Sequence, residues 1–214
     1  MGTIRNGANG GFKGKAGSVI GSSWKSIDYI KGLYKKRTKP ATEEQLVQQA
    51  KFRTLMRFLL PITAFIRIGF GQKKEALMTA INVAFKENLE PALTGDYPDY
   101  ALDYSKLRIS DGHFVGGGSE TVSVDAGILS VSWDTTPNEL YQTKDDDRVY
   151  ILLYQPTIDQ FMSAPTPPQR GDGGVDITLP NHFLGAEGHV WIFFADRTKK
   201  KVSRSAYLGT VNLA

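Results

Sequence analysis

The sequence predicts an α+β fold, in which a basic, glycine-rich arm and a helical hairpin precede an antiparallel β-sandwich. Three observations predict it: seven glycines lie within the first 23 residues, helical periodicity runs from residue 43 to residue 88, and seven strand-like runs follow residue 106. The helical periodicity ends after Pro91, where tyrosines recur in a connector that also contains Pro and Asp. We therefore expect two modules, residues 1–96 and residues 97–214.

The arm, residues 1–23, is expected to order only against another surface. Glycine loses more backbone entropy on folding than any other residue, so a segment this rich in glycine is costly to order alone. Residues 24–34 mix strand and helical spacing, and Gly32 weakens a helix, so a short strand is predicted there. Residues 35–40, KKRTKP, are expected to form a loop.

Helix signals begin at Thr42, an expected N-cap with Gln45 three residues later, and predict a helix over residues 43–60. Pro61 should kink or restart this helix, because proline lacks a backbone N–H and its ring clashes with the preceding turn. A second helix is predicted over residues 74–88, where apolar residues recur at helical spacing. Two helices with a short link imply an αα-hairpin.

The strand-like runs that follow suggest a β-sandwich, with hairpin turns at Asp111-Gly112 and at Asp125-Ala126-Gly127. With its alternating apolar residues, this C-terminal part resembles a fibronectin type III or immunoglobulin-like sandwich, with Trp133 as the inward-facing core tryptophan. The resemblance implies an architecture and no activity. The predicted strands cover residues 107–110, 120–124, 127–133, 148–154, 175–179, 189–195 and 202–211.

A second resemblance rests on four segments of the chain. They are GFKGKAGSVIGSSWKSIDYIK (11–31), TEEQLVQQAKF (42–52), LPNHFLG (179–185) and SAYLG (205–209). These segments resemble a family of uncharacterised small proteins from the Bacteroidetes, a domain family of unknown function. The resemblance extends over nearly the whole chain and brings no activity, cofactor or catalytic residue with it.

Charge is distributed unevenly along the chain. Residues 1–57 hold 12 Lys and Arg against 3 acidic residues, a balance of +9, and the remainder holds 14 against 19, a balance of −5. Such asymmetry is typical of nucleic-acid or anionic-surface binding, and it equally suits head-to-tail association between copies of one chain. The candidate contact residues for a protein partner or nucleic acid are Lys13, Lys15, Trp24, Lys25, Tyr29, Lys35, Lys36, Arg37 and Lys39.

Motifs of common enzymes and metal sites do not fit the sequence. The chain has no Cys, and a phosphate-binding loop would need Gly where Asn9 stands and Ser or Thr where Ala16 stands. The three histidines form no helical metal-binding pair, and no nucleophile has an assignable base, so no catalytic residue, metal or cofactor is expected.

Two further loops have simple interpretations. Residues 145–147 are all Asp, lack the spacing of a calcium-binding loop and are expected to form an acidic turn. The tripeptide Arg170-Gly171-Asp172 resembles an integrin-binding tip on a fibronectin-like domain, but turn chemistry is sufficient to explain it.

These observations favour a non-enzymatic structural or interaction protein, which self-assembles into a homo-oligomer or docks a protein partner through its arm and its β-sandwich. The alternative is a nucleic-acid-binding protein that uses the basic segment from Arg5 to Lys39. No apolar run reaches the length of a membrane span and no signal peptide is recognisable, so a cytoplasmic location is expected by default.

Overall fold

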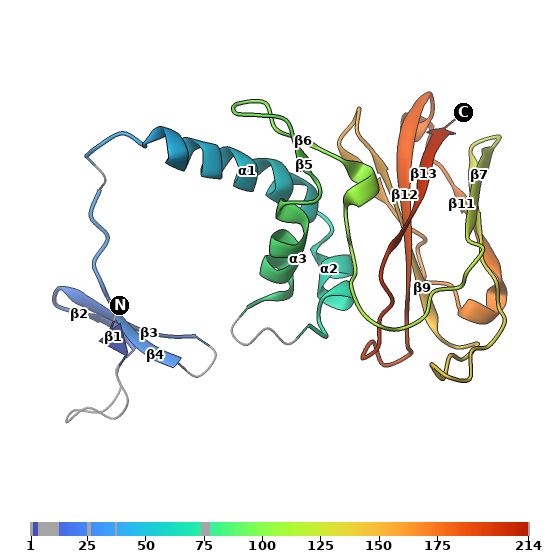
Figure 1. The fold of residues 1–214 in the computed structure, drawn as a ribbon, viewed down its shortest axis with the longest axis horizontal. Helices are drawn as coiled ribbons and strands as arrows, with labels where there is room; N and C mark the ends of the chain where they lie inside the picture. The colour runs from blue at the N-terminus through green and yellow to red at the C-terminus, as the bar shows by residue number, and fades with distance from the viewer. Residues whose placement is uncertain (1, 4–12, 25–26, 37, 74–77, 214) are drawn as a thin grey trace. The chain divides into compact units, whose positions relative to one another are not determined.

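The computed structural model describes residues 2–3, 13–24, 27–36, 38–73 and 78–213 (Figure 1). The chain divides into two compact units, Met1–Gln45 and Leu46–Ala214. This division falls well before the boundary after residue 96 that the sequence suggests.

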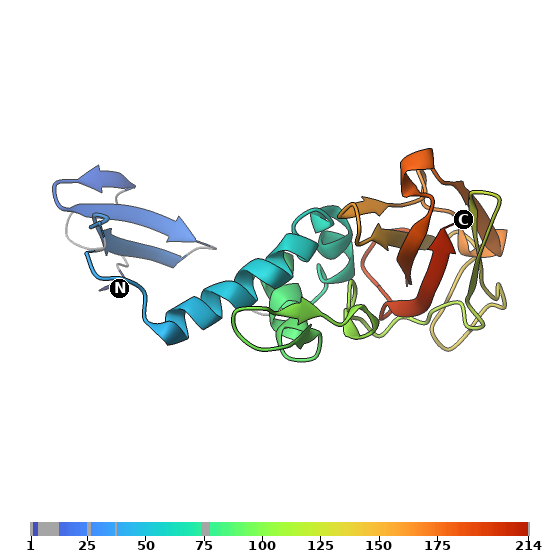
Figure 2. The same cartoon turned by 90° about the horizontal axis from the view of Figure 1, so that it is seen from above.

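The first unit, whose strands are drawn in blue in Figure 2, forms an antiparallel sheet. It has four strands in the order β1-β4-β3-β2. The short strand predicted over residues 24–34 is confirmed as β4, whereas the later part of the predicted arm is corrected to β2 and β3 of the same sheet. Gly17 adopts a φ of +58° in the two-residue turn between β2 and β3, a conformation that glycine adopts without strain. The strands are β1 (Gly2–Thr3), β2 (Gly14–Ala16), β3 (Val19–Trp24) and β4 (Ile27–Gly32).

Helix α1 (Glu43–Leu59) follows the sheet and has the predicted bounds to within one residue. The Thr42 backbone N–H donates to Gln45 Oε1 at 3.4 Å, which forms half of the predicted capping box. Pro61 separates α1 from α2 (Thr63–Gly69), so the expected restart of the helix is confirmed.

Helix α3 (Ala80–Leu89) is shorter than the predicted second helix. The Thr79 side chain caps it by accepting a hydrogen bond from the Asn82 backbone N–H at 3.4 Å. A helix therefore begins at Ala80, and residues 74–77 of the predicted helix lie outside the described residues. A small hairpin that the sequence did not predict comes next, with β5 (Leu93–Thr94) paired to β6 (Ala101–Leu102).

Two antiparallel sheets complete the second unit. One has the order β10-β9-β12-β13 and the other has the order β11-β8-β7. Five of the predicted strands are confirmed, while the last one begins at Ala206 rather than Val202 and β10 was not predicted. The strands are β7 (Thr121–Asp125), β8 (Ile128–Ser132), β9 (Arg148–Gln155), β10 (Gln160–Met162), β11 (Gly174–Thr178), β12 (Ala186–Ala195) and β13 (Ala206–Leu213).

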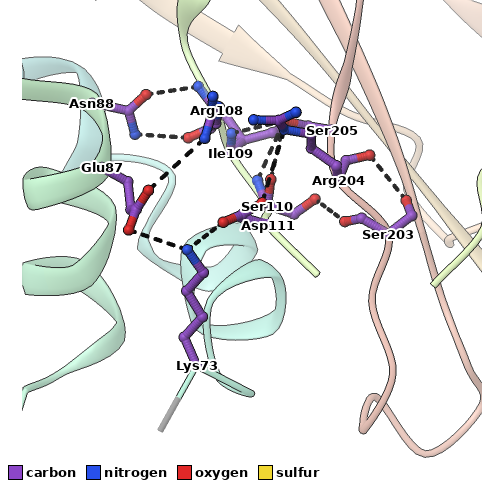
Figure 3. A network of polar contacts seen from close by, with 10 residues as sticks. All are labelled: Lys73, Glu87, Asn88, Arg108, Ile109, Ser110, Asp111, Ser203, Arg204 and Ser205. Carbon is purple, nitrogen blue, oxygen red and sulfur yellow. Dashed lines mark hydrogen bonds and ion pairs between the residues drawn. The ribbon is translucent and has the colours of Figure 1, made fainter. Parts of the chain in front are cut away.

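Residues 107–110 do not form the strand predicted for them. The Arg108 N–H donates to Asn88 Oδ1 at 2.7 Å, and Asn88 Nδ2 donates to the Arg108 carbonyl at 2.9 Å. The Ile109 N–H donates to Ser205 Oγ at 3.1 Å (Figure 3). Side chains thus form hydrogen bonds with the backbone of this segment, so these backbone groups do not need a neighbouring strand as a partner.

The Asp111-Gly112 pair is likewise not the hairpin turn that was predicted. A Cβ atom added to Gly112 would lie 2.2 Å from the Val202 carbonyl oxygen, so this glycine permits a close approach of two backbones. The turn at Ala126 and Gly127 is confirmed: both residues have positive φ, 47° and 74°, in the two-residue connection between β7 and β8.

The four-stranded sheet of the second unit, β10-β9-β12-β13, is covered on both faces. One face packs against the three-stranded sheet through a core that includes Ile151 and Phe194. The other face packs against the helices through a second core, in which Tyr150 and Trp191 lie with Phe58 of α1. Because the helices and the sandwich share this sheet, they belong to one compact unit and no division follows residue 96.

Candidate functional site

The candidate binding surface is one face of the N-terminal sheet. Successive residues of a strand point to opposite faces, and directly paired residues share a face. The register pairs Lys15 with Ile20, Ile20 with Lys31, Ser22 with Tyr29 and Trp24 with Ile27. We call this set the aromatic face: Lys15, Ile20, Ser22, Trp24, Ile27, Tyr29 and Lys31.

The opposite face of the sheet has much smaller side chains. It contains three described glycines of β2, β3 and β4, together with Ala16, Val19, Ser23, Asp28 and Ile30. The apolar and aromatic area of the sheet is therefore concentrated on the aromatic face.

The described part of this sheet has no apolar core. Every buried hydrophobic side chain found among the described residues lies at Leu55 or later in the chain. Trp24 is 48% exposed, and Ile20, Ile27 and Tyr29 are partly exposed. A small sheet usually gains its stability by burying one face, so the aromatic face is a surface suited to being covered.

The structure brings together three of the predicted contact residues, Lys15, Trp24 and Tyr29, on this face. Sequence reasoning missed Ile20 and Ile27 as members of the same surface. The signal that could have found them is the alternation of side chains on either side of a Gly-Ser turn at residues 17–18.

The remaining predicted contact residues do not lie in the sheet's strands. Lys13 precedes β2, and Lys35, Lys36 and Lys39 follow β4; all four are exposed. Lys25 and Arg37 lie outside the described residues.

The Arg170-Gly171-Asp172 tripeptide is not an exposed tip. It forms a short 3-10 helix, and the Arg170 side chain is 1% exposed, where it donates to the Val115 and Gly116 carbonyls at 2.7 and 2.9 Å. The Arg170 carbonyl in turn accepts a hydrogen bond from Trp133 Nε1 at 2.8 Å. Trp133 is buried in the sandwich core, as predicted.

Residues 145–147 lie in a turn, as predicted, where the Asp147 N–H donates to the Lys144 carbonyl at 3.1 Å. The Asp147 side chain pairs with Arg170. The carboxylate lies 3.4 Å from Arg170 Nε, and both side chains are buried. Burial raises the pKa of Asp147 and lowers the pKa of Arg170, because both charged forms lose hydration. The pair is thus a structural element of the core rather than a surface feature.

The histidines are separated in the structure. His189 stacks on Tyr104 with ring centroids 4.2 Å apart, and its Nδ1 lies 2.7 Å from the Tyr207 hydroxyl. No group of three His, Asp or Glu side chains that could hold a metal ion is found within the described residues. In the same part of the chain, no helix is both long enough and apolar enough to cross a membrane.

The fold and this surface together define an α+β protein with antiparallel sheets, in which an exposed N-terminal sheet precedes a helix-covered body. The chain belongs to the DUF6266 family of unknown function, which matches residues 11–209. This match confirms the predicted resemblance to a family of unknown function, and the Bacteroidetes source stays a prediction. A search of curated proteins found no match.

Proposed function

We propose that this protein is a non-enzymatic structural or interaction protein that self-assembles through its N-terminal sheet. The observation that carries the proposal is the aromatic face, which presents Ile, Trp and Tyr side chains on a sheet whose described residues bury no hydrophobic side chain. Covering that face would remove apolar area from water at roughly 25 cal/mol per Å².

Charge favours a second copy of the chain as the partner. The first unit has nine Lys and Arg against three acids, whereas the second unit has 17 against 19. A cationic first unit and a slightly acidic second unit attract each other when they belong to different copies, which leads to head-to-tail association. Among the described strands β2 lies at an edge of the sheet, and that edge could add strand pairing to this contact.

The experiment that tests this proposal is the solution mass of nuclease-treated protein, measured by light scattering. We expect the full chain to form an oligomer and a variant without residues 1–41 to be monomeric, because both described cores lie after that segment. Equal association states for the two proteins would overturn the proposal.

A matched pair of substitutions localises the contact to one face. Ile20 and Ile30 lie on neighbouring strands, are similarly exposed and occupy opposite faces. Ile20→Ser should weaken association about tenfold or more, and Ile30→Ser should change it by less than about threefold. An equal effect of the two substitutions would remove the aromatic face from the proposal.

Single-stranded nucleic acid is the second candidate partner. The observation that favours it is the placement of Lys15 and Lys31 on the same face as Trp24 and Tyr29. Aromatic rings on a sheet can stack on bases while lysines neutralise phosphates.

Fluorescence anisotropy with a labelled oligothymidine tests this second candidate. Replacing Lys15 and Lys31 with Gln should weaken binding and flatten its dependence on salt, because two phosphate contacts are lost. Replacing Lys106 and Lys199 with Gln, two exposed lysines of the second unit, provides the control. The candidate fails if both double variants bind equally.

We also infer that the sandwich is of the fibronectin type III kind. Lettering its seven strands A, B, C, C′, E, F and G in chain order gives sheets A-B-E and C′-C-F-G. That strand order supports the predicted architecture. A cytoplasmic location of the protein is also proposed.

A further inference from the structure

The second unit contains an open cavity of about 810 Å³. Four segments line it: residues 72–73, 111–114, 140–142 and 200–202. This volume is in the range of sites that hold small molecules.

A polar network at one wall neutralises its own charges. Lys73 Nζ forms ion pairs with Glu87 at 3.1 Å and with Asp111 (Figure 3). Arg108 reaches Glu87 at 3.8 Å, and Arg204 reaches Asp111 at 3.9 Å. Both carboxylates are therefore held by cations, and this wall offers a ligand no free negative charge.

The turn on the other side of the cavity supplies positive charge. Lys200 and Lys201 both line the cavity, and neither forms an ion pair with a carboxylate among the described residues. Lys201 Nζ lies 3.5 Å from Gln142 Oε1, which is a weak hydrogen bond. The cavity thus has an excess of cations that can receive an anionic group.

Apolar side chains line the rest of the cavity. Phe114 and Val202 are buried, while Leu140 is 84% exposed and Tyr141 is 43% exposed. A ligand with an apolar body would cover the side chains of Leu140 and Tyr141, which are otherwise in contact with water.

We propose that this cavity binds a small anionic ligand with an aromatic body, whose acidic group lies against Lys200 and Lys201 and whose rings pack on Leu140 and Tyr141. The two lysines select a negative charge, and the apolar pair selects a ring system over a bare inorganic anion. All of its lining residues belong to the second unit, so this proposal does not rest on the proposed self-assembly.

The probe for this proposal is 1-anilinonaphthalene-8-sulfonate, titrated into the full-length protein and followed by fluorescence and calorimetry. The double variant Lys200→Gln/Lys201→Gln should bind it about five- to tenfold more weakly, because two charge contacts are lost. Lys199→Gln is the matched control, since Lys199 belongs to the same lysine run but does not line the cavity. The affinity of the Lys199→Gln variant for this probe should stay within about twofold of the affinity of the original protein.

Two further measurements separate the apolar contribution from the charge. Leu140→Ser should weaken binding of the same probe, and the neutral analogue N-phenyl-1-naphthylamine should bind the original protein at least about fivefold more weakly than the sulfonate. Near-UV circular dichroism establishes that each variant is folded. Equal affinities for the double variant and the Lys199 control, or for charged and neutral probes, would overturn the proposal.

Discussion

At the scale of single residues, the most constrained group is the Arg170 guanidinium. It is held by an ion pair to Asp147, by two backbone carbonyls and by the Phe194 ring, which lies 4.5 Å from the guanidinium carbon. Arg and Asp are rarely buried without partners, and these contacts provide them here. Turn chemistry is sufficient to explain the tripeptide in the sequence, and only the structure shows that Arg170 is buried.

Arg170→Met should lower the free energy of unfolding by about 3–5 kcal/mol, because it leaves the Asp147 carboxylate buried without its cation. Urea unfolding followed by circular dichroism measures this change. Arg197→Met is the control: Arg197 pairs with Asp146 at 3.5 Å, but their side chains are 74% and 41% exposed. That exposed pair should contribute less than about 1 kcal/mol, so similar losses for the two variants would contradict the argument.

His189 gives the protein a pH-dependent contribution to stability. Burial lowers the pKa of His189 from its ordinary value of 6.5, and the Glu187 charge offsets this only in part. The unfolded chain therefore binds the proton more readily than the fold does, and stability falls as the pH drops through 6.5 toward the folded pKa.

A His189→Gln variant should lose less stability than the original protein between pH 7.5 and pH 5.5. Urea unfolding at both pH values measures the difference, and carboxylates that titrate at lower pH cancel in the comparison. His113→Gln is the control because His113 is exposed. An unchanged pH dependence in His189→Gln would exclude His189 as the source.

At the scale of elements, the turn between β7 and β8 is favoured by local sequence at only one of its two positions. Ala126 and Gly127 both adopt positive φ, which matches the right-handed twist of the two strands. Glycine tolerates this conformation, whereas alanine at a φ of 47° brings its Cβ close to the backbone. The turn thus forms despite an unfavourable residue at its first position.

Ala126→Asn should raise the free energy of unfolding by about 0.5–1 kcal/mol, because Asn-Gly is the preferred pair in this type of turn. Ala126→Val should lower stability, since a β-branched side chain is poorly suited to positive φ. Thermal unfolding compares the three proteins. A lower stability for Ala126→Asn would contradict the turn assignment.

At the scale of the whole molecule, the second unit depends on a sheet that is buried on both faces. In β12, every residue from Val190 to Ala195 is buried, because one set of side chains faces the sandwich core and the other faces the helices. The helices are therefore a necessary cover for the sandwich rather than a separate module.

A fragment of residues 97–214 should fail to fold as a stable monomer, because it exposes the sheet face that holds Tyr150, Leu152, Trp191 and Phe193. A fragment of residues 42–214 should unfold in one cooperative transition. Near-UV circular dichroism and light scattering compare the two fragments. A well-folded 97–214 monomer would support a module boundary after residue 96 instead.

The sequence by itself determined the α+β class, helix α1, five sandwich strands and the turn at Ala126-Gly127. Each of these follows from signals within a few residues: a cap, a proline, alternation of apolar side chains, or a turn pair. The run of buried residues in β12 also has the composition of a strand covered on both faces.

Only the tertiary structure decided where the units divide and why residues 107–110 are not a strand. Both depend on contacts between segments far apart in the sequence, Trp191 with α1 and Arg108 with Asn88. Periodicity reports which side of an element is apolar, but it carries no information about which element covers that side. Local sequence therefore determines the helices and strands of this chain, and long-range packing determines which of their faces are covered.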